Sequence, residues 1–154
     1  MVEGPESTQN ELSQPPSDAM NRRMTHPIET RRFNHAALNS RDLGRSVEFY
    51  CGVLGFHEIP RPGFSFAGSW LYRDGLGMVL HLIQDANFNP PRDRIESRKN
   101  HLAFRADVDI ARERLREHGI EFVEHILPDY GYRQLFFHDP DGNVIELGEW
   151  PDVN

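Results

Sequence analysis

Residues 135–147 read LFFHDPDGNVIEL, and residues 70–82 read WLYRDGLGMVLHL. The two stretches align without a gap at a constant offset of 65 positions. An Asp, a Gly, a Val and a Leu coincide, and most other positions agree in character. Each stretch has two apolar runs around a glycine-containing turn, which is typical of a β-hairpin. Because the hairpin occurs twice, we predict an internal repeat that decides the fold.

The repeat extends toward the N-terminus of each hairpin. Asn34-His35 and Asn100-His101 each open a short apolar run that is followed by a helical pattern. The apolar positions of these patterns are Leu43, Val47, Tyr50 and Leu54, and then Val108, Ala111 and Leu115. Such spacing places them on one helix face, and Gly55 and Gly119 follow where a helix end favours positive φ. We therefore predict an α+β fold of two βαβββ modules, over about residues 33–84 and 99–149.

The first 32 residues differ from the rest of the chain in composition. They hold few apolar residues and four prolines, so they cannot bury enough surface to offset the entropy of ordering. We predict a disordered tail over residues 1–32 and one folded domain over residues 33–154. The tail contains early acidic residues and no apolar core segment, which disfavours a secretory signal or a transit peptide.

Charge and cysteine content exclude several classes of function. Lys and Arg number 17 against 24 Asp and Glu, which gives a net charge of −7. A protein this acidic lacks the basic face that nucleic acids and anionic membranes require. The single cysteine, Cys51, excludes an internal disulfide and a cysteine-based zinc motif, and it suits a reducing, cytoplasmic location. We expect a small-molecule partner, with no nucleic acid and no membrane.

The repeat pairs four potential metal ligands. His35 aligns with His101, and His81 aligns with Glu146. His35 and His101 belong to the first predicted strand of each module, and His81 and Glu146 belong to the last. If a pseudo-twofold axis relates the two modules, these four side chains meet at one point. Imidazole and carboxylate groups bind first-row divalent metals, and a carboxylate in an apolar strand is costly unless it is paired or bound to a cation. We predict a metal site made of His35, His81, His101 and Glu146.

Each of these residues has a plainer interpretation when it is taken alone. A single histidine in a strand is usually a hydrogen-bonded core or edge residue, and Glu146 could pair with an arginine such as Arg105. Phe66, Trp70 and Phe136 could line an apolar substrate pocket, although ordinary core packing explains such aromatic residues equally well. The matched positions in the repeat are what favour the metal site.

These residues together resemble the vicinal oxygen chelate superfamily, which contains glyoxalases, bleomycin resistance proteins and extradiol dioxygenases. The resemblance covers residues 33–150 and is most specific over residues 139–147. It also rests on the Asn-His pairs at residues 34–35 and 100–101 and on the helix-strand passage at residues 46–56. Within the superfamily the chain is most similar to plant glyoxalase-I-like proteins.

The resemblance implies two βαβββ modules that form an open, U-shaped mixed sheet around a divalent metal, often in a homodimer. It places His35, His101 and Glu146 on ligand positions, and His81 where glyoxalase I enzymes usually have a glutamate. Three neutral histidines and one glutamate leave the site with a net charge of +1, which acidifies a bound group further. Asn39 stands where many glyoxalase I enzymes have an arginine that helps to hold the glutathione carboxylate.

Three functions follow as hypotheses. The first is a glyoxalase-I-like lyase or isomerase, similar to lactoylglutathione lyase, in which Zn, Ni, Mn or Fe polarises a substrate with two vicinal oxygens and Glu146 moves a proton. The substrate could be a glutathione hemithioacetal. The second is a non-haem iron dioxygenase with His35, His101 and Glu146 as its two histidines and carboxylate. The third is a protein that binds a metabolite without catalysis.

Overall fold

The computed structural model describes residues 28–151 of the chain. The chain divides into two units, Met1–Arg32 and Phe33–Asn154. Residues 28–34 are exposed and have no regular secondary structure. Most of the predicted disordered tail, residues 1–27, lies outside the described residues.

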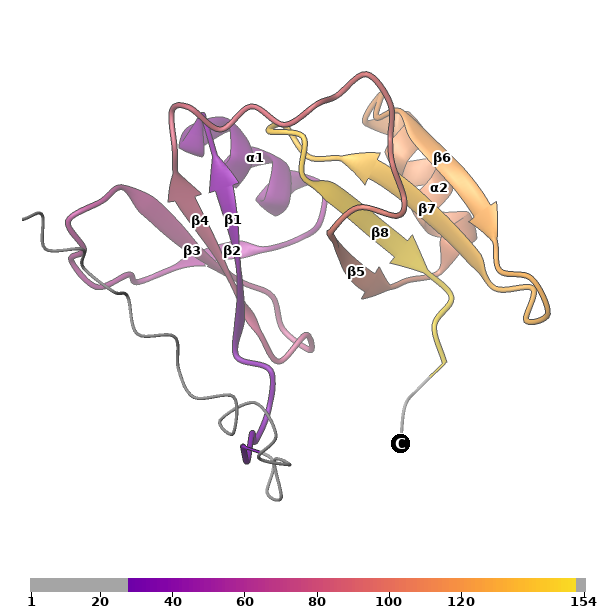
Figure 1. The fold of residues 1–154 in the computed structure, drawn as a ribbon, viewed down its shortest axis with the longest axis horizontal. Helices are drawn as coiled ribbons and strands as arrows, with labels where there is room; N and C mark the ends of the chain where they lie inside the picture. Colours follow the sequence, from indigo (N-terminus) through magenta and orange to yellow (C-terminus); the bar gives the residue numbers. More distant parts are fainter. Residues whose placement is uncertain (1–27, 152–154) are drawn as a thin grey trace, which may run out of the picture. The chain divides into compact units, whose positions relative to one another are not determined.

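Two modules follow one another with the same order of elements. The first consists of β1 (His35–Ser40), α1 (Leu43–Gly52), β2 (His57–Ile59), β3 (Gly68–Tyr72) and β4 (Val79–Gln84). The second consists of β5 (His101–Arg105), α2 (Val108–Glu117), β6 (Phe122–Ile126), β7 (Arg133–His138) and β8 (Val144–Gly148). Figure 1 shows the two modules joined by the segment between β4 and β5. The predicted β-α-β-β-β order is confirmed in both repeats.

Each module contains one four-stranded mixed sheet. The strand orders are β1-β4-β3-β2 and β5-β8-β7-β6. In both sheets the first strand pairs in parallel with the last strand of its module, and the other pairs are antiparallel. The helix supplies the crossover that a parallel pair needs. The predicted α+β class is therefore confirmed, with one mixed sheet in each repeat.

The helix boundaries follow from local sequence. The Asp42 carboxylate caps the start of α1 by accepting one backbone N–H, and the Asp107 carboxylate caps α2 by accepting two. These bonds satisfy amides that have no partner within a helix. Gly55 and Gly119 follow the helices with φ of 70° and 65°, as the repeat predicted.

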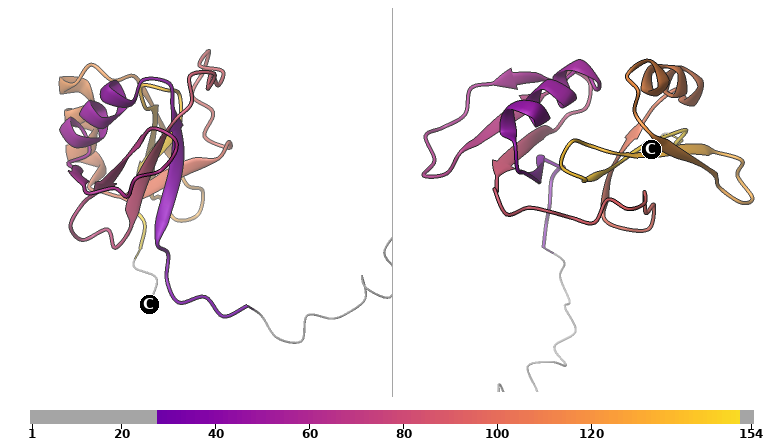
Figure 2. Two further views of the ribbon diagram at one scale, coloured as in Figure 1. Left: turned by 90° about the vertical axis from the view of Figure 1, so that its left-hand side faces the viewer. Right: turned by 90° about the horizontal axis from the view of Figure 1, so that it is seen from above.

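The core lies between the sheets and the helices. Figure 2 shows α1 and α2 on the same side of the two sheets. The most deeply buried side chains of the core include Tyr50, Leu71, Leu80, Val108, Leu115, Leu135, Phe137 and Ile145. The strand residues in this list alternate with residues on the opposite, more open faces of the sheets. Among residues 28–151, no helix combines the length and apolar character needed to span a bilayer.

Buried carboxylates of the β7–β8 turn connect the second module to the first. Asp139 Oδ2 accepts a hydrogen bond of 2.8 Å from the Tyr50 hydroxyl of α1. Asp141 accepts hydrogen bonds from the Ser46 hydroxyl and, at 3.0 Å, from the backbone N–H of Arg41. Both carboxylates are only 3% exposed. Because a buried acceptor without a partner is costly, these bonds hold the turn at a fixed place against α1.

The same bonds shift the acidities of the buried groups. Burial raises the pKa of Asp139, although hydrogen bonds from Asn143 and Tyr50 oppose the rise. At Asp141 burial acts in the same upward direction, but hydrogen bonds, led by that from Ser46, outweigh it and lower the pKa. Burial and the neighbouring Asp139 raise the pKa of Tyr50, which therefore stays a neutral donor.

Tyr50→Phe tests this connection. The variant keeps the ring but leaves Asp139 Oδ2 with Asn143 as its side-chain donor. We expect a loss of about 1–2 kcal/mol in the free energy of unfolding, measured by chemical denaturation. Tyr130→Phe is the matched control, because Tyr130 is 74% exposed. Equal stability of the two variants would show that the buried bond contributes nothing.

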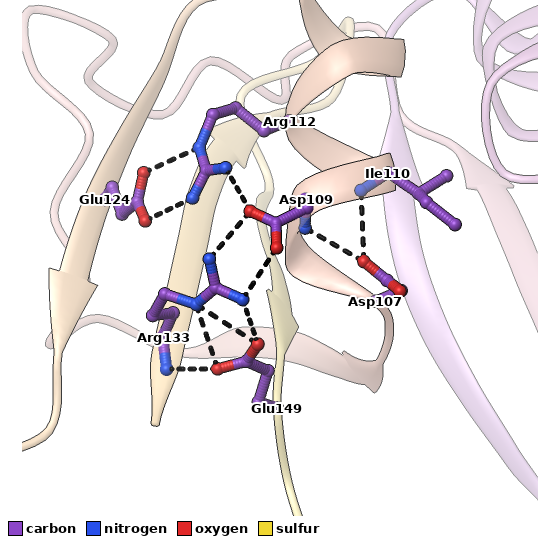
Figure 3. A network of polar contacts seen from close by, with 7 residues as sticks. All are labelled: Asp107, Asp109, Ile110, Arg112, Glu124, Arg133 and Glu149. Carbon is purple, nitrogen blue, oxygen red and sulfur yellow. Dashed lines mark hydrogen bonds and ion pairs between the residues drawn. The ribbon is translucent and has the colours of Figure 1, made fainter. Parts of the chain in front are cut away.

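A charged network binds α2 to the second sheet (Figure 3). Asp109 of α2 pairs with Arg133 of β7 at 2.7 Å and with Arg112 at 2.6 Å. Arg112 also pairs with Glu124 of β6, and Arg133 with Glu149 just after β8. The two arginines therefore link one helix to both strands of a hairpin and to the segment that leaves the sheet.

The network should make stability depend on pH. Hydrogen bonds from Arg133, and then from Arg112, lower the pKa of Asp109 from 3.8 to about 2. Because the pKa of Asp109 is lower in the folded than in the unfolded chain, its ionised carboxylate stabilises the fold fully above about pH 4. This stabilisation is lost as the pH falls toward about 2. Arg133→Met should lower Tm at neutral pH, and the Tm difference from the native chain should shrink below about pH 4. A difference that stays constant down to acid pH would contradict this assignment.

Candidate metal-binding residues

The first two predicted ligands lie together on the open face of the first sheet. The imidazole rings of His35 and His81 stack with centroids 4.1 Å apart and an interplanar angle of 15°. Trp70 lies opposite His81 on the other side of that strand, and the two rings stack with centroids 4.6 Å apart and an interplanar angle of 7°. The three rings come from β1, β4 and β3, because those strands are adjacent in the sheet. We call His35 and His81 the first pair.

The environment of His81 favours a neutral imidazole. The Nδ1 atom of His35 lies 2.9 Å from Asn34 Oδ1, so the ring donates there and leaves Nε2 available. Burial lowers the pKa of His81, and the neighbouring His35 and Arg61 lower it further. Neutral imidazole is the form that binds a metal ion.

The other two predicted ligands form the second pair, in the second sheet. His101 Nε2 of β5 lies 2.9 Å from Glu146 Oε2 of β8. Glu146 is only 1% exposed. Its second oxygen, Oε1, accepts hydrogen bonds from Gln134 Nε2 at 2.8 Å and from Trp150 Nε1 at 2.7 Å. One oxygen is thus occupied by neutral donors, and the other faces the histidine.

The proton on His101 decides what the second pair can do. His101 Nδ1 lies 2.8 Å from the backbone carbonyl of Lys99, which only accepts, so Nδ1 carries a proton. In a neutral ring Nε2 then has a lone pair, and this lone pair faces a carboxylate oxygen. Two acceptors at 2.9 Å repel unless the ring takes a second proton or a cation lies between them. Either a second proton on the ring or a bound cation satisfies this arrangement, so the two side chains are compatible with a metal ion, and each has a further polar partner that fixes its orientation.

The structure brings the four predicted ligands together as two pairs and not as one group of four. Within residues 28–151, no three His, Cys, Asp or Glu side chains lie close enough to hold one metal ion. A cavity of about 750 Å³ lies elsewhere, between the end of α1 and α2, with Leu54, Phe56 and Leu115 in its wall. None of the four predicted ligands lines that cavity.

The predicted substrate-binding aromatic residues are divided between the two pairs. Trp70 stacks on His81, and Phe66 lies in the β2–β3 loop with 45% of its surface exposed. Phe136 of β7 is buried and contacts the His101 ring edge-on, with centroids 5.5 Å apart. Each pair therefore has an aromatic neighbour on the same face of its sheet.

The sequence analysis missed the residues that hold Glu146. Gln134 is paired with Gly148 across the β7–β8 hairpin, and Trp150 folds back over Gly148 to reach the carboxylate. A Cβ on Gly148 would lie 2.7 Å from Trp150 Nε1 and 3.1 Å from Glu146 Oε1. An isolated glycine within an apolar strand often marks such a close approach, and it was the available signal.

The fold and the two pairs define a class of protein: a duplicated βαβββ chain with histidine and carboxylate groups at equivalent strand positions. The sequence profile of the Glyoxalase/Bleomycin resistance protein/Dioxygenase superfamily matches residues 32–147. The chain belongs to this superfamily, and the resemblance found in the sequence is confirmed.

Individual relatives agree with this assignment. Glyoxylase I 4 of Arabidopsis thaliana is 34% identical over 126 residues, which cover 79% of this chain and 72% of the relative. Catechol-2,3-dioxygenase of Bacillus subtilis is 32% identical over 130 residues, which cover 80% of this chain but only 43% of that enzyme. The crystal structure of a glyoxalase family protein from Bacillus anthracis is 25% identical, with a TM-score of 0.65 over 80% of this chain and 98% of its own.

Gly148→Ala tests the contact that holds Glu146. The added methyl group would collide with the indole nitrogen, so Trp150 should move away and leave Gln134 as the side-chain donor to Oε1. We expect a loss of about 1–3 kcal/mol in the free energy of unfolding, and a shift of Trp150 emission to longer wavelength in a Trp70→Phe background.

Gly52→Ala is the matched control, because a Cβ there meets no atom within 4 Å. Unchanged emission and stability in Gly148→Ala would mean that Trp150 does not depend on this approach.

Proposed function

We propose that the protein is a metal-dependent lyase or isomerase, similar to glyoxalase I, that acts on a small molecule with two vicinal oxygens. His35, His81, His101 and Glu146 would hold the divalent ion, which is Zn, Ni, Mn or Fe. Glu146 would also act as the base. Membership of the superfamily supports the class of chemistry, and the two pairs support the choice of residues.

One observation carries this proposal. The Nε2 atom of His101 and Oε2 of Glu146 approach to 2.9 Å, while the remaining polar atoms of both side chains already have partners. The two hydrogen bonds on Oε1 satisfy a carboxylate that is buried, and they also hold Oε2 in a fixed direction toward His101. A fixed direction of the lone pairs is what a metal ligand requires.

The chain's own residues would divide the chemistry as follows. A bound divalent ion would supply a Lewis acid that makes a C–H bond next to a carbonyl more acidic. Oε2 of Glu146 would accept that proton and return it to the adjacent carbon, as a general base does. Gln134 and Trp150 would hold Oε1, so that the carboxylate keeps its orientation while the proton moves. Phe136 beside His101 would exclude water from that side.

We further propose that two copies of the chain complete the site. Each pair offers two ligands on one sheet, and in one chain the pairs do not meet. In a twofold dimer, the first pair of one copy would face the second pair of the other, which yields two equivalent sites. Each site would then contain three histidines and one glutamate.

The substrate could be a glutathione hemithioacetal, as the similarity to a glyoxylase I suggests. Asn39 does not carry the positive charge that would pair with a glutathione carboxylate at that position. We therefore expect weak or no turnover of methylglyoxal with glutathione, and preference for a different vicinal-oxygen substrate. Steady-state assays of that mixture, with metal content measured in parallel, test this expectation.

An iron-dependent dioxygenase is the second candidate. The similarity to a catechol-2,3-dioxygenase favours it. His35, His101 and Glu146 would then bind iron alone. Metal analysis after anaerobic purification separates the candidates: iron with catechol consumption supports the dioxygenase, and another metal supports the lyase.

Glu146→Gln tests the role of the base. The variant keeps an oxygen ligand but loses basicity, so bound metal should fall only modestly. Turnover of the true substrate should fall by about 10²-fold or more, the usual contribution of a positioned base. Metal content is measured in the same samples, since lost metal would imitate a lost base. Unchanged turnover would leave Glu146 as a ligand only, and a wild-type chain that binds metal without any turnover would be a metabolite-binding protein.

Mixing two inactive variants tests the proposed dimer. His81→Ala damages the first pair, and Glu146→Gln damages the second. If each site takes one pair from each copy, refolding the two variants together should restore about a quarter of wild-type activity, because half of the dimers are mixed and each has one intact site. If both pairs come from the same chain, the mixture should stay as inactive as its components.

A further inference from the structure

An arginine, Arg61, lies beside the first pair. Arg61, in the loop between β2 and β3, donates from Nη2 to the carbonyl oxygen of Phe66 at 2.9 Å. Its guanidinium carbon lies 4.5 Å from the ring centre of Phe64 and 4.9 Å from that of Phe66. Among the described residues, no carboxylate pairs with Arg61. The two rings and one carbonyl fix the cation without neutralising it.

A glycine makes room for this cation on the face that carries the histidines. A Cβ built on Gly68 would lie 2.5 Å from the carbonyl oxygen of Leu82 and 3.4 Å from Nε and Nη2 of Arg61, so a side chain there would meet both the neighbouring strand and the guanidinium. Gly68 and Trp70 share one face of β3 because side chains alternate along a strand. In the register, Gly68 opposes Ile83 and Trp70 opposes His81. Gly68 is therefore a diagonal neighbour of His81, at about 7–8 Å.

The surroundings of Arg61 are aromatic and open. Phe64 and Phe66 are 46% and 45% exposed, although large apolar side chains are usually buried. The Phe64 ring lies 5.3 Å from Phe66 and 6.1 Å from Trp70, centre to centre. An exposed aromatic group next to an unneutralised cation offers two different contacts to one ligand: a ring face and a carboxylate partner.

We propose that Arg61, Phe64 and Phe66 form a subsite for the carboxylate end of an aromatic substrate. This inference rests on the proposed function, in which the vicinal oxygens of the same substrate lie at the metal. Arg61 is then a specificity residue that selects an aromatic acid over its neutral analogue.

The protein as a whole is acidic, with a net charge of −7, so a general attraction to anions does not explain a preference for an acid. A guanidinium with free N–H groups binds a carboxylate through charge-assisted hydrogen bonds, which contribute about 1.5–3 kcal/mol.

The first experiment tests the subsite without a metal. The full-length chain, treated with a chelator, is titrated with benzoate and with benzamide, and binding is followed by NMR. We expect benzoate to bind about tenfold more tightly than benzamide. Arg61→Met should abolish the preference while benzamide binding stays unchanged, and Arg61→Lys should retain part of it. Arg116→Met is the matched control, because Arg116 also lies over a ring, that of Phe122, but belongs to α2.

A native chain without the preference, or an Arg61→Met chain that keeps it, overturns the inference. The second experiment repeats the titration with 3,4-dihydroxybenzoate on the zinc-loaded protein. Zinc should strengthen binding of this probe by at least about tenfold over the metal-free protein, because its vicinal oxygens then have a partner. If Arg61 governs the benzoate preference but zinc adds nothing, the subsite stands and the proposed metal chemistry fails.

Discussion

The hydrogen bonds that Asp139 and Asp141 accept from the first module are the contact on which the arrangement of the modules depends. Both carboxylates are buried in the turn between β7 and β8, and their donors lie in α1 and next to β1. Apolar contacts between modules can slide, whereas a buried carboxylate needs its donors at fixed distances. The turn therefore fixes the β7–β8 hairpin relative to the first module, and this hairpin carries Glu146, Gln134 and Phe136.

Glu146 has a place both in the packing of the fold and in the proposed chemistry. It is a carboxylate in an otherwise apolar strand, and its burial is compensated by Gln134 and Trp150 on one oxygen and by His101 on the other. Trp150 reaches it only because Gly148 has no side chain, and Arg133 holds Glu149 beside it through the charged network. Glu146, Gly148, Glu149 and Trp150 come from one strand end, and residues of the neighbouring strands β7 and β5 complete the arrangement.

The repeat allowed much of the architecture to be predicted from the sequence. The offset between residues 70–82 and 135–147 gave the order of elements, and the same alignment selected His35, His81, His101 and Glu146. Strand pairing then placed these residues in two pairs, as adjacent first and last strands require. The separation of the pairs was not predictable, because the alignment gives the symmetry of the modules but not the contact between them. Gln134, Trp150 and Arg61 were missed since their roles depend on cross-strand register and on the space that Gly148 and Gly68 leave.

The two hairpin turns of the repeat have diverged in what surrounds them. Residues 139–142 are held between modules, whereas in the turn of residues 74–77 a Cβ on Gly75 or Gly77 would meet no neighbouring atom. A loop lengthened at Gly75 would extend from an exposed residue, with Leu76 as the one residue of this turn packed against the core, but the same insertion at Asp141 would break the link to α1. The duplicated chain thus has one hairpin that is free to acquire new sequence, and with it new surface, while its counterpart must stay at its present length.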